Sequence, residues 1–161
     1  MMSIYETETA DLQEQHVALV HGRIARDEIP VFLATAYSKT PRASTEQGLR
    51  VIGPPYARYR FEEDGTIDIE AGFPVSGTLE RSDDVEPGTL PGGHVAITVH
   101  VGPYDEVGRA YQALETYLSK NGFEPAGSAW ECYLDGPDVP EPRTRIYLPA
   151  QRLSHRRPPS K

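Results

Sequence analysis

The sequence predicts an α+β domain in which one strand–helix–strand–strand unit occurs twice. Two observations carry this prediction. Segments recur in the same order: HVALV at residues 16–20 returns as HVAIT at residues 94–98, and GLRVIG at 48–53 returns as GFEPAG at 122–127. Each copy also holds one helical stripe of apolar residues among alternating strand patterns. Two such units predict an antiparallel sheet with both helices on one face, leaving the other face as a ligand cleft on a pseudo-two-fold axis.

The first copy begins with a strand and continues into a helix. His16–Ile24 alternates as a strand. Asp27 is the expected N-cap of the helix, and Pro41 is expected to break or kink it. The apolar positions that share one helical face are Ile29, Phe32, Leu33, Ala36 and Tyr37.

The rest of the first copy is predicted to be a β-hairpin. Its strands are expected at residues 57–62 and 66–73, with Asp64-Gly65 as the turn between them. Residues 79–91 are rich in Asp, Glu, Pro and Gly, and we expect them to form a loop that joins the two copies.

The second copy repeats this order. His94–Val101 is expected to be a strand, and Gly102–Asp105 a turn whose last residue caps the next helix. Asn121-Gly122 should end that helix. Its apolar stripe is Val107, Ala110, Tyr111, Leu114 and Leu118. The closing strands are expected at residues 131–134 and 143–148.

The length of 161 residues fits a single domain. We place the domain at residues 1–150, with the repeats at about 16–75 and 94–149. Residues 151–161 are basic and contain adjacent prolines, so we expect a disordered tail.

Composition excludes several classes of function. The net charge of −8 argues against direct nucleic-acid binding, and no apolar run is long enough for a membrane span. Cys and His do not cluster, and no glycine-rich phosphate loop is present, so neither a metal site nor a cofactor is expected. One cysteine and an acidic N-terminus without signal-peptide character predict a cytoplasmic protein.

Four segments together carry a resemblance to a known family. They are DIEAGFPV at residues 68–75, LPGG at 90–93, HVGPYD at 100–105 and WECYL at 130–134. Over residues 17–149 the chain resembles the GyrI-like small-molecule-binding family, which includes the effector-binding domains of AraC-type and MerR-type regulators. The resemblance implies the same duplicated fold and a cleft for hydrophobic, often cationic, small molecules. It also implies that Glu131 is the acid of that cleft.

The family leaves more than one activity open. Some stand-alone members are hydrolases that open cyclopropane-bearing electrophiles. We expect no helix-turn-helix before His16, which departs from the regulator relatives and argues against direct transcription control.

Strand parity singles out the same acid. Glu131 and Tyr133 share one face of their strand, and Trp130 lies on the other. We expect the apolar side to face the helices, so that Glu131 and Tyr133 face the cleft. The matching positions of the first copy are Ala57 and Tyr59. The pseudo-symmetry therefore predicts two tyrosines facing each other, with one acid between them.

The chemistry of such an acid depends on its ligand. A carboxylate among aromatic rings loses hydration and could neutralise a lipophilic cation, with the rings adding cation–π attraction. It could equally activate water as a general base, with Tyr133 donating to a developing oxyanion. The alternative is a glutamate on a solvated strand face. The candidate ligand-binding residues are Tyr59, Glu70, Phe73, His100, Tyr104, Trp130, Glu131, Tyr133 and Tyr147.

Several of these residues have a structural alternative. Glu70 could form a salt bridge with its repeat partner Arg145. Tyr104 could cover the pocket or anchor its turn, and His100 could be a pocket base or a structural hydrogen-bonding residue. Parity favours a core position for Trp130. The helical aromatics Phe32, Tyr37, Tyr111 and Tyr117 are most simply core or helix-surface residues. Cys132 shares the core-facing parity of Trp130, and a buried thiol keeps a high pKa, which argues against a nucleophile.

Three functions therefore follow from the sequence. The first is a stand-alone domain that binds, and so sequesters or detoxifies, a hydrophobic aromatic or cationic drug-like or toxin-like molecule. The second is a cofactor-independent hydrolase of cyclopropane-type electrophiles with Glu131 and Tyr133 as catalytic residues. The third is a gyrase-inhibitor-like protein-interaction module that acts through its edge strands or the acidic segment 81–86.

Overall fold

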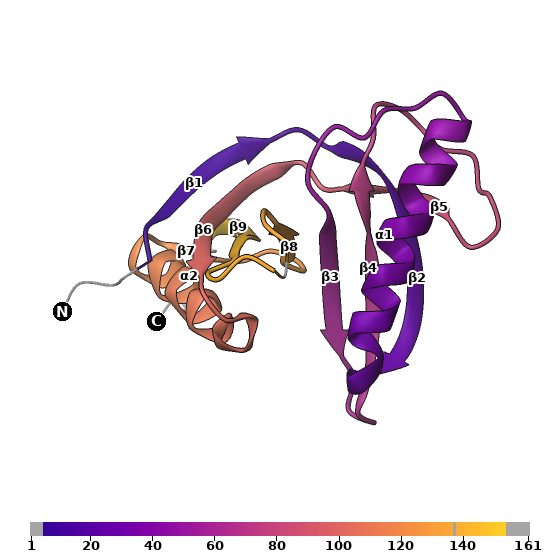
Figure 1. Ribbon diagram of the computed structural model, residues 1–161. Helices are drawn as coiled ribbons and strands as arrows, with labels where there is room; N and C mark the ends of the chain where they lie inside the picture. The colour runs from indigo at the N-terminus through magenta and orange to yellow at the C-terminus, as the bar shows by residue number, and fades with distance from the viewer. Residues whose placement is uncertain (1–4, 137, 154–161) are drawn as a thin grey trace.

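The computed structural model describes residues 5–136 and 138–153 and contains one antiparallel sheet with two helices (Figure 1). The strands are β1 (Thr7–Leu12), β2 (Gln15–Ala25), β3 (Tyr56–Phe61), β4 (Thr66–Pro74), β5 (Glu86–Leu90), β6 (Gly93–Val101), β7 (Phe123–Pro125), β8 (Trp130–Tyr133) and β9 (Arg143–Arg152). The helices are α1 (Ile29–Glu46) and α2 (Gly108–Lys120), preceded by the 3-10 turns η1 (Arg26–Glu28) and η2 (Tyr104–Glu106). The sheet order is β1-β6-β9-β8-β3-β4-β2-β5, and β7 pairs with β9. The predicted α+β class is confirmed.

The duplication organises the sheet around its centre. The first copy is β2-α1-β3-β4 and the second is β6-α2-β8-β9. The two copies join where β3 pairs with β8, and Ala57 there lies directly opposite Glu131. These two residues are also equivalent positions of the two repeats. The pseudo-two-fold axis therefore passes between them.

Both helices cover the same face of the sheet. Helix α1 packs Ala36 and Ala43 against Ala18 and Ala71 of the first copy. Helix α2 packs its own apolar stripe, Ala110, Leu114 and Leu118, against Ala96, Ile146 and Leu148. Strand register places Ala71 opposite Ala57, and Glu131 opposite both Ala57 and Ile146, so all of these residues share one face.

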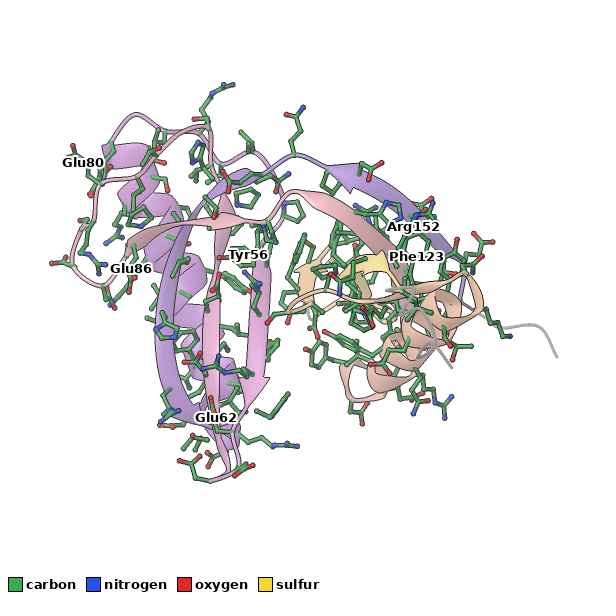
Figure 2. The ribbon with its side chains drawn as sticks, turned by 180° about the vertical axis from the view of Figure 1, so that it is seen from behind. Tyr56, Glu62, Glu80, Glu86, Phe123 and Arg152 are labelled. Carbon is green, nitrogen blue, oxygen red and sulfur yellow. The ribbon has the colours of Figure 1, made fainter. Side chains whose placement is uncertain are left out.

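The other face is filled over part of its area by a second core, where the prediction left it free. The sheet curls as an arc (Figure 1), and side chains of both copies meet inside the curl. Figure 2 turns the molecule by 180° from the view of Figure 1, with Tyr56 labelled near its middle. The residues buried there are Val17, Leu19, Tyr56, Leu90, Val95, Ile97, Trp130 and Cys132. Trp130 and Cys132 therefore face this second core. Their apolar character predicted that they would face the helices, and that prediction is wrong.

Two strands lie outside the predicted pattern. β1 pairs with β6 as an edge strand, although its TETADL sequence is largely polar. β5 occupies part of the predicted loop at residues 79–91 and pairs with β2. Pro87 is tolerated there because β5 is the opposite edge of the sheet, where a missing N–H breaks no inner ladder. Leu90 at its end is buried.

The helix boundaries also differ from the prediction. Asp27 is not the N-cap, because η1 comes first and the Glu28 carboxylate accepts the backbone N–H of Ala25 at 2.7 Å. Pro41 lies inside α1, which continues to Glu46. The hydroxyl of Thr40 donates to the Ala36 carbonyl at 2.8 Å and supplies a hydrogen bond beside the proline. Asp105 lies within η2 and is not a cap of α2.

The segment expected to be a disordered tail, residues 151–161, begins within a strand. β9 runs on to Arg152 and so includes the start of the segment expected to be a tail. Residues 154–161 lie outside the described residues. Within residues 5–136 and 138–153, neither helix is long and apolar enough to cross a membrane.

Candidate functional site

A buried carboxylate lies at the junction of the two copies. Glu131 is 3% exposed and lies on the helix-covered face of β8. Its Oε1 accepts hydrogen bonds from the hydroxyls of Tyr104 and Tyr133, the latter at 2.9 Å. Its Oε2 accepts a hydrogen bond from the hydroxyl of Tyr111 at 2.5 Å. Three tyrosines from η2, α2 and β8 therefore hold one acid.

A fourth tyrosine extends this network into the first copy. The hydroxyls of Tyr59 and Tyr133 are 2.7 Å apart. Because Tyr133 donates its proton to Glu131, Tyr59 must be the donor in the contact between the two tyrosines. The result is a directed chain from Tyr59 through Tyr133 to the carboxylate. The carboxylate therefore lies beyond Tyr133, at one end of this chain, and not between the two tyrosines as the pseudo-symmetry predicted.

The setting keeps these phenols protonated. Burial, followed by the negative charge of Glu131, raises the pKa of Tyr104, Tyr111 and Tyr133 above the usual tyrosine value. A phenol that holds its proton remains a hydrogen-bond donor. The three hydroxyls are therefore available to donate to the oxygens of Glu131.

Helix α1 adds aromatic rings beside the network. Tyr37 packs edge-to-face against Tyr133, with ring centroids 6.4 Å apart, and against Phe73, at 5.6 Å. Its hydroxyl donates to the Tyr56 carbonyl oxygen at 2.9 Å. Tyr37 and Tyr111 were interpreted from sequence as core residues. The sequence feature that could have indicated their part in the network is the polar hydroxyl that each adds to an otherwise apolar helical stripe.

His100 supports the turn that carries Tyr104. Its side chain is buried, with Nε2 2.8 Å from the Pro103 carbonyl oxygen and Nδ1 2.9 Å from the Tyr5 hydroxyl. A carbonyl oxygen only accepts, so Nε2 is the donor to Pro103, and Nδ1 shares a hydrogen bond with the Tyr5 hydroxyl. Both ring nitrogens are thereby engaged, which fits the structural alternative for His100. Tyr104 in turn donates a hydrogen bond to Glu131, so it contributes to the buried network as well as to the turn.

Three candidate residues lie on the opposite face of the sheet. Glu70 accepts a hydrogen bond from the Tyr56 hydroxyl at 2.7 Å. Trp130 and Tyr147 stack on each other, with centroids 5.1 Å apart and an interplanar angle of 9°. Parity separated Trp130 from Glu131 as expected, but these three residues do not line the site around Glu131.

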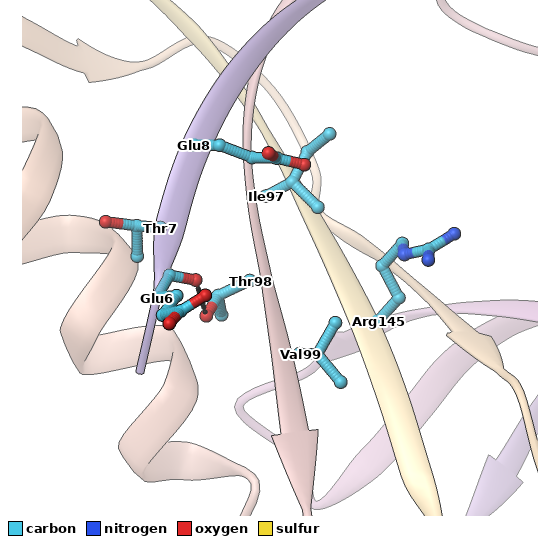
Figure 3. A pocket seen from close by; sticks show the side chains of 7 residues that line it. All are labelled: Glu6, Thr7, Glu8, Ile97, Thr98, Val99 and Arg145. Carbon is cyan, nitrogen blue, oxygen red and sulfur yellow. Dashed lines mark hydrogen bonds between the residues drawn. The ribbon is translucent and has the colours of Figure 1, made fainter. Parts of the chain in front are cut away.

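A cavity of about 400 Å³ also opens on that opposite face, beside β1, β6 and β9 (Figure 3). It contains none of the candidate residues. Arg145 borders it and forms no ion pair with Glu70 among the described residues, so the expected salt bridge is absent there. The cavity is lined by Glu6, Thr7, Glu8, Ile97, Thr98, Val99 and Arg145.

In the described part of the chain, the geometry favours neither a nucleophilic thiol nor a bound metal ion. Burial raises the pKa of the Cys132 thiol to about 12, so the thiolate is scarce at neutral pH. Within residues 5–136 and 138–153, no three His, Cys, Asp or Glu side chains are grouped to hold a metal ion.

The duplicated fold and the buried acid match one family model. The model of the GyrI-like small molecule binding domain matches residues 5–151. The chain belongs to this GyrI-like family. No curated protein sequence matches it.

Several solved structures share the GyrI-like fold at low sequence identity. The C-terminal domain of EcmrR is 20% identical, with a TM-score of 0.77 over 94% of this chain and 100% of that one. In the EcmrR–DNA complex, the chain spans 59% of the EcmrR chain. A hydrolase from Listeria innocua is 12% identical, with a TM-score of 0.69 over 91% of this chain and 92% of that one. A protein solved with tetraphenylphosphonium bound is 15% identical, with a TM-score of 0.59 over 94% and 98%.

The contribution of one hydroxyl to the network is measurable. Tyr111→Phe removes the sole donor to Oε2 of Glu131 among the described residues and leaves the ring in place. We expect it to lower the free energy of unfolding by about 1–3 kcal/mol, the cost of an unsatisfied charged acceptor. Urea denaturation measures this loss. Tyr117→Phe is the matched control on the same helix, because no described residue bonds its hydroxyl; an equal loss there would contradict the prediction.

Proposed function

We propose that this GyrI-like domain binds a lipophilic aromatic cation and that Glu131 supplies the opposite charge. The burial of Glu131 without an ion-pair partner carries the proposal. Among the described residues, only tyrosine hydroxyls contact its oxygens, and no Lys, Arg or His forms an ion pair with it. Hydrogen bonds satisfy the carboxylate but do not neutralise it. A buried charge of this kind favours a ligand of opposite sign.

The surrounding rings favour an aromatic or quaternary cation over a small hydrated one. Cations bind the faces of tyrosine rings, and a lipophilic cation loses less hydration on burial. Of the three tyrosines on the acid, Tyr104 is the most accessible, at 43% exposed, and it belongs to the short turn η2. We therefore expect Tyr104 to move aside when a ligand reaches the carboxylate.

The structural neighbour solved with tetraphenylphosphonium supports this ligand class, although the ligand is a property of that protein. It also supplies a suitable probe. Tetraphenylphosphonium and tetraphenylborate have nearly the same size and shape but opposite charge. Their comparison isolates the sign of the charge that the site prefers.

We expect tetraphenylphosphonium to bind at least about tenfold more tightly than tetraphenylborate, because one close charge contact in a partly desolvated site contributes roughly 1.4 kcal/mol or more. Isothermal titration calorimetry with each ion measures both dissociation constants. Triphenylphosphine oxide serves as the neutral control and should fall between them. Equal binding of the two ions, or tighter binding of the borate, would reject the proposal.

A hydrolase remains the second candidate, supported by the same buried acid and by a neighbour named as a hydrolase. Glu131 would take a proton from water as the water oxygen bonds to a ring carbon. One ring C–C bond would break, and its electron pair would pass to a conjugated carbonyl oxygen of the substrate, to which a tyrosine hydroxyl donates. The proton held by Glu131 would then pass to the product and restore the carboxylate. Incubation with a cyclopropane-bearing alkylator, followed by chromatography, tests this activity. Turnover that survives Glu131→Gln would exclude this mechanism.

A further inference from the structure

The aromatic network at Glu131 continues along β3 to the surface. The Phe61 ring stacks on Tyr59, with centroids 6.4 Å apart and an interplanar angle of 16°. Phe61 is 61% exposed, so much of its ring is accessible to a ligand from solvent. The guanidinium carbon of Arg26 lies 5.3 Å from the Phe61 ring centroid. A continuous row therefore leads from the buried acid to an arginine at the surface.

Strand pairing leaves this row accessible along one side. β3 pairs with β8 only at Tyr56 and Ala57, so the edge from Arg58 to Phe61 has no strand partner on that side among the residues that the structure describes. Figure 1 shows β3 running on past β8 toward the start of α1. Ala57, Tyr59 and Phe61 share the helix-covered face. Phe61 lies four residues beyond the position opposite Glu131, or about 13 Å along the strand.

The two ends of the row carry opposite charges. Glu131 is the inner end, and it is buried. Arg26 is the outer end, and its side chain has no ion-pair or hydrogen-bond partner among the described residues. Two other arginines near this hairpin differ, because Arg60 pairs with Glu62 and Asp68, and Arg23 pairs with Glu62. Arg58 forms no ion pair among the described residues either, but it lies over the Trp130 ring on the opposite face of the sheet. Arg26 is thus a cation next to the site without a counter-charge of its own.

The geometry points to a bipolar ligand, with a lipophilic cation at Glu131, an apolar section along Tyr59 and Phe61, and an anionic group such as a carboxylate at Arg26. This inference rests on the proposed function and adds an outer subsite to it. A carboxylate accepts hydrogen bonds from a guanidinium in a matching planar geometry, which a neutral end group cannot do. Arg26 and Phe61 would then determine specificity for the distal end of the ligand.

Two alkyltriphenylphosphonium probes test the subsite. Both carry an arm of ten methylene groups, which ends in a carboxylate in one probe and in a methyl group in the other. We expect the carboxylate probe to bind about fivefold more tightly to the wild-type protein, a typical upper value for an exposed ion pair. In Arg26→Gln the ratio should fall to about one. Arg60→Gln, on the same hairpin but the opposite face of β3, should keep the wild-type ratio.

A second variant separates the apolar contact from the charge. Phe61→Ala should weaken both long-arm probes about threefold, while binding of tetraphenylphosphonium, which has no arm, stays the same. Equal binding of the two long-arm probes to the wild-type protein would overturn the bipolar ligand and leave the Glu131 cation site intact. If no phosphonium binds at all, the cation site fails as well, and the two failures are therefore distinguishable.

Discussion

Glu131→Gln should weaken tetraphenylphosphonium binding by about thirtyfold or more. Glutamine keeps the length of the side chain and one acceptor oxygen for the tyrosine hydroxyls, but it removes the negative charge. Removing one partner of a buried charge contact costs about 2–5 kcal/mol, and 2 kcal/mol corresponds to roughly thirtyfold in affinity. Isothermal titration calorimetry on wild type and variant measures the ratio of dissociation constants.

Glu70→Gln is the matched control for this substitution. Glu70 is also a strand glutamate that accepts a tyrosine hydrogen bond, but it lies on the opposite face of the sheet. Its replacement should leave tetraphenylphosphonium affinity unchanged. A similar loss in both variants would mean that net charge, and not the position of Glu131, governs binding.

The stability of Glu131→Gln gives an independent check. The buried carboxylate has no cationic partner among the described residues, so its removal takes away an uncompensated charge. We expect the ligand-free free energy of unfolding to stay level or rise while affinity falls. A substitution that lowers ligand affinity without lowering stability is typical of a residue retained for binding. A fall in both quantities would instead assign Glu131 a structural role.

The repeats made the centre of the site predictable from sequence. Aligning the two copies matched Ala57 with Glu131 and Tyr59 with Tyr133. In the structure, the first two are opposite each other across the central strands and the hydroxyls of the last two are 2.7 Å apart. Pseudo-symmetry fixes such relations, because equivalent residues near an axis must lie close together.

The side of the sheet on which the site lies could not be predicted in the same way. Parity shows which residues share a face, but only an apolar–polar alternation shows which face is buried. Here neighbours on β2 are buried on both faces: Val17 packs inside the curl and Ala18 packs under α1. The curl arises from packing between the two copies, which strand periodicity does not encode. Trp130 was therefore placed against the helices, where Glu131 lies instead.

The remaining differences arise from tertiary contacts that override local signals. Pro87 and Gly88 are typical of a loop, yet pairing with β2 makes this segment an edge strand. Tyr111 fits a helical core stripe, and nothing local indicates that its hydroxyl meets a carboxylate from β8. The donors around Glu131 come from elements far apart in the chain, so they could be found only in the folded structure.

Ala57→Glu should destabilise the domain by about 3–5 kcal/mol, the largest stability effect that we expect. The substitution restores the symmetry that the natural sequence breaks, and it places two carboxylates opposite each other across β3 and β8. Directly opposite Cβ atoms in an antiparallel pair are about 5 Å apart, and Ala57 is fully buried. Two like charges at that separation, both out of water, oppose folding strongly.

Ala57→Gln isolates the charge from the added volume. It overfills the same space and should cost about 1–3 kcal/mol, as is usual for overpacking. Urea denaturation at neutral pH should therefore show a further loss of roughly 2 kcal/mol in the glutamate variant. At acidic pH, where carboxylates take up protons, that difference should shrink, since the repulsion needs both groups charged. Equal stability of the two variants at neutral pH would contradict the prediction, because it would mean that the β3–β8 junction tolerates a second carboxylate. Charge repulsion would then not explain why only one of the two repeats carries an acid at this position.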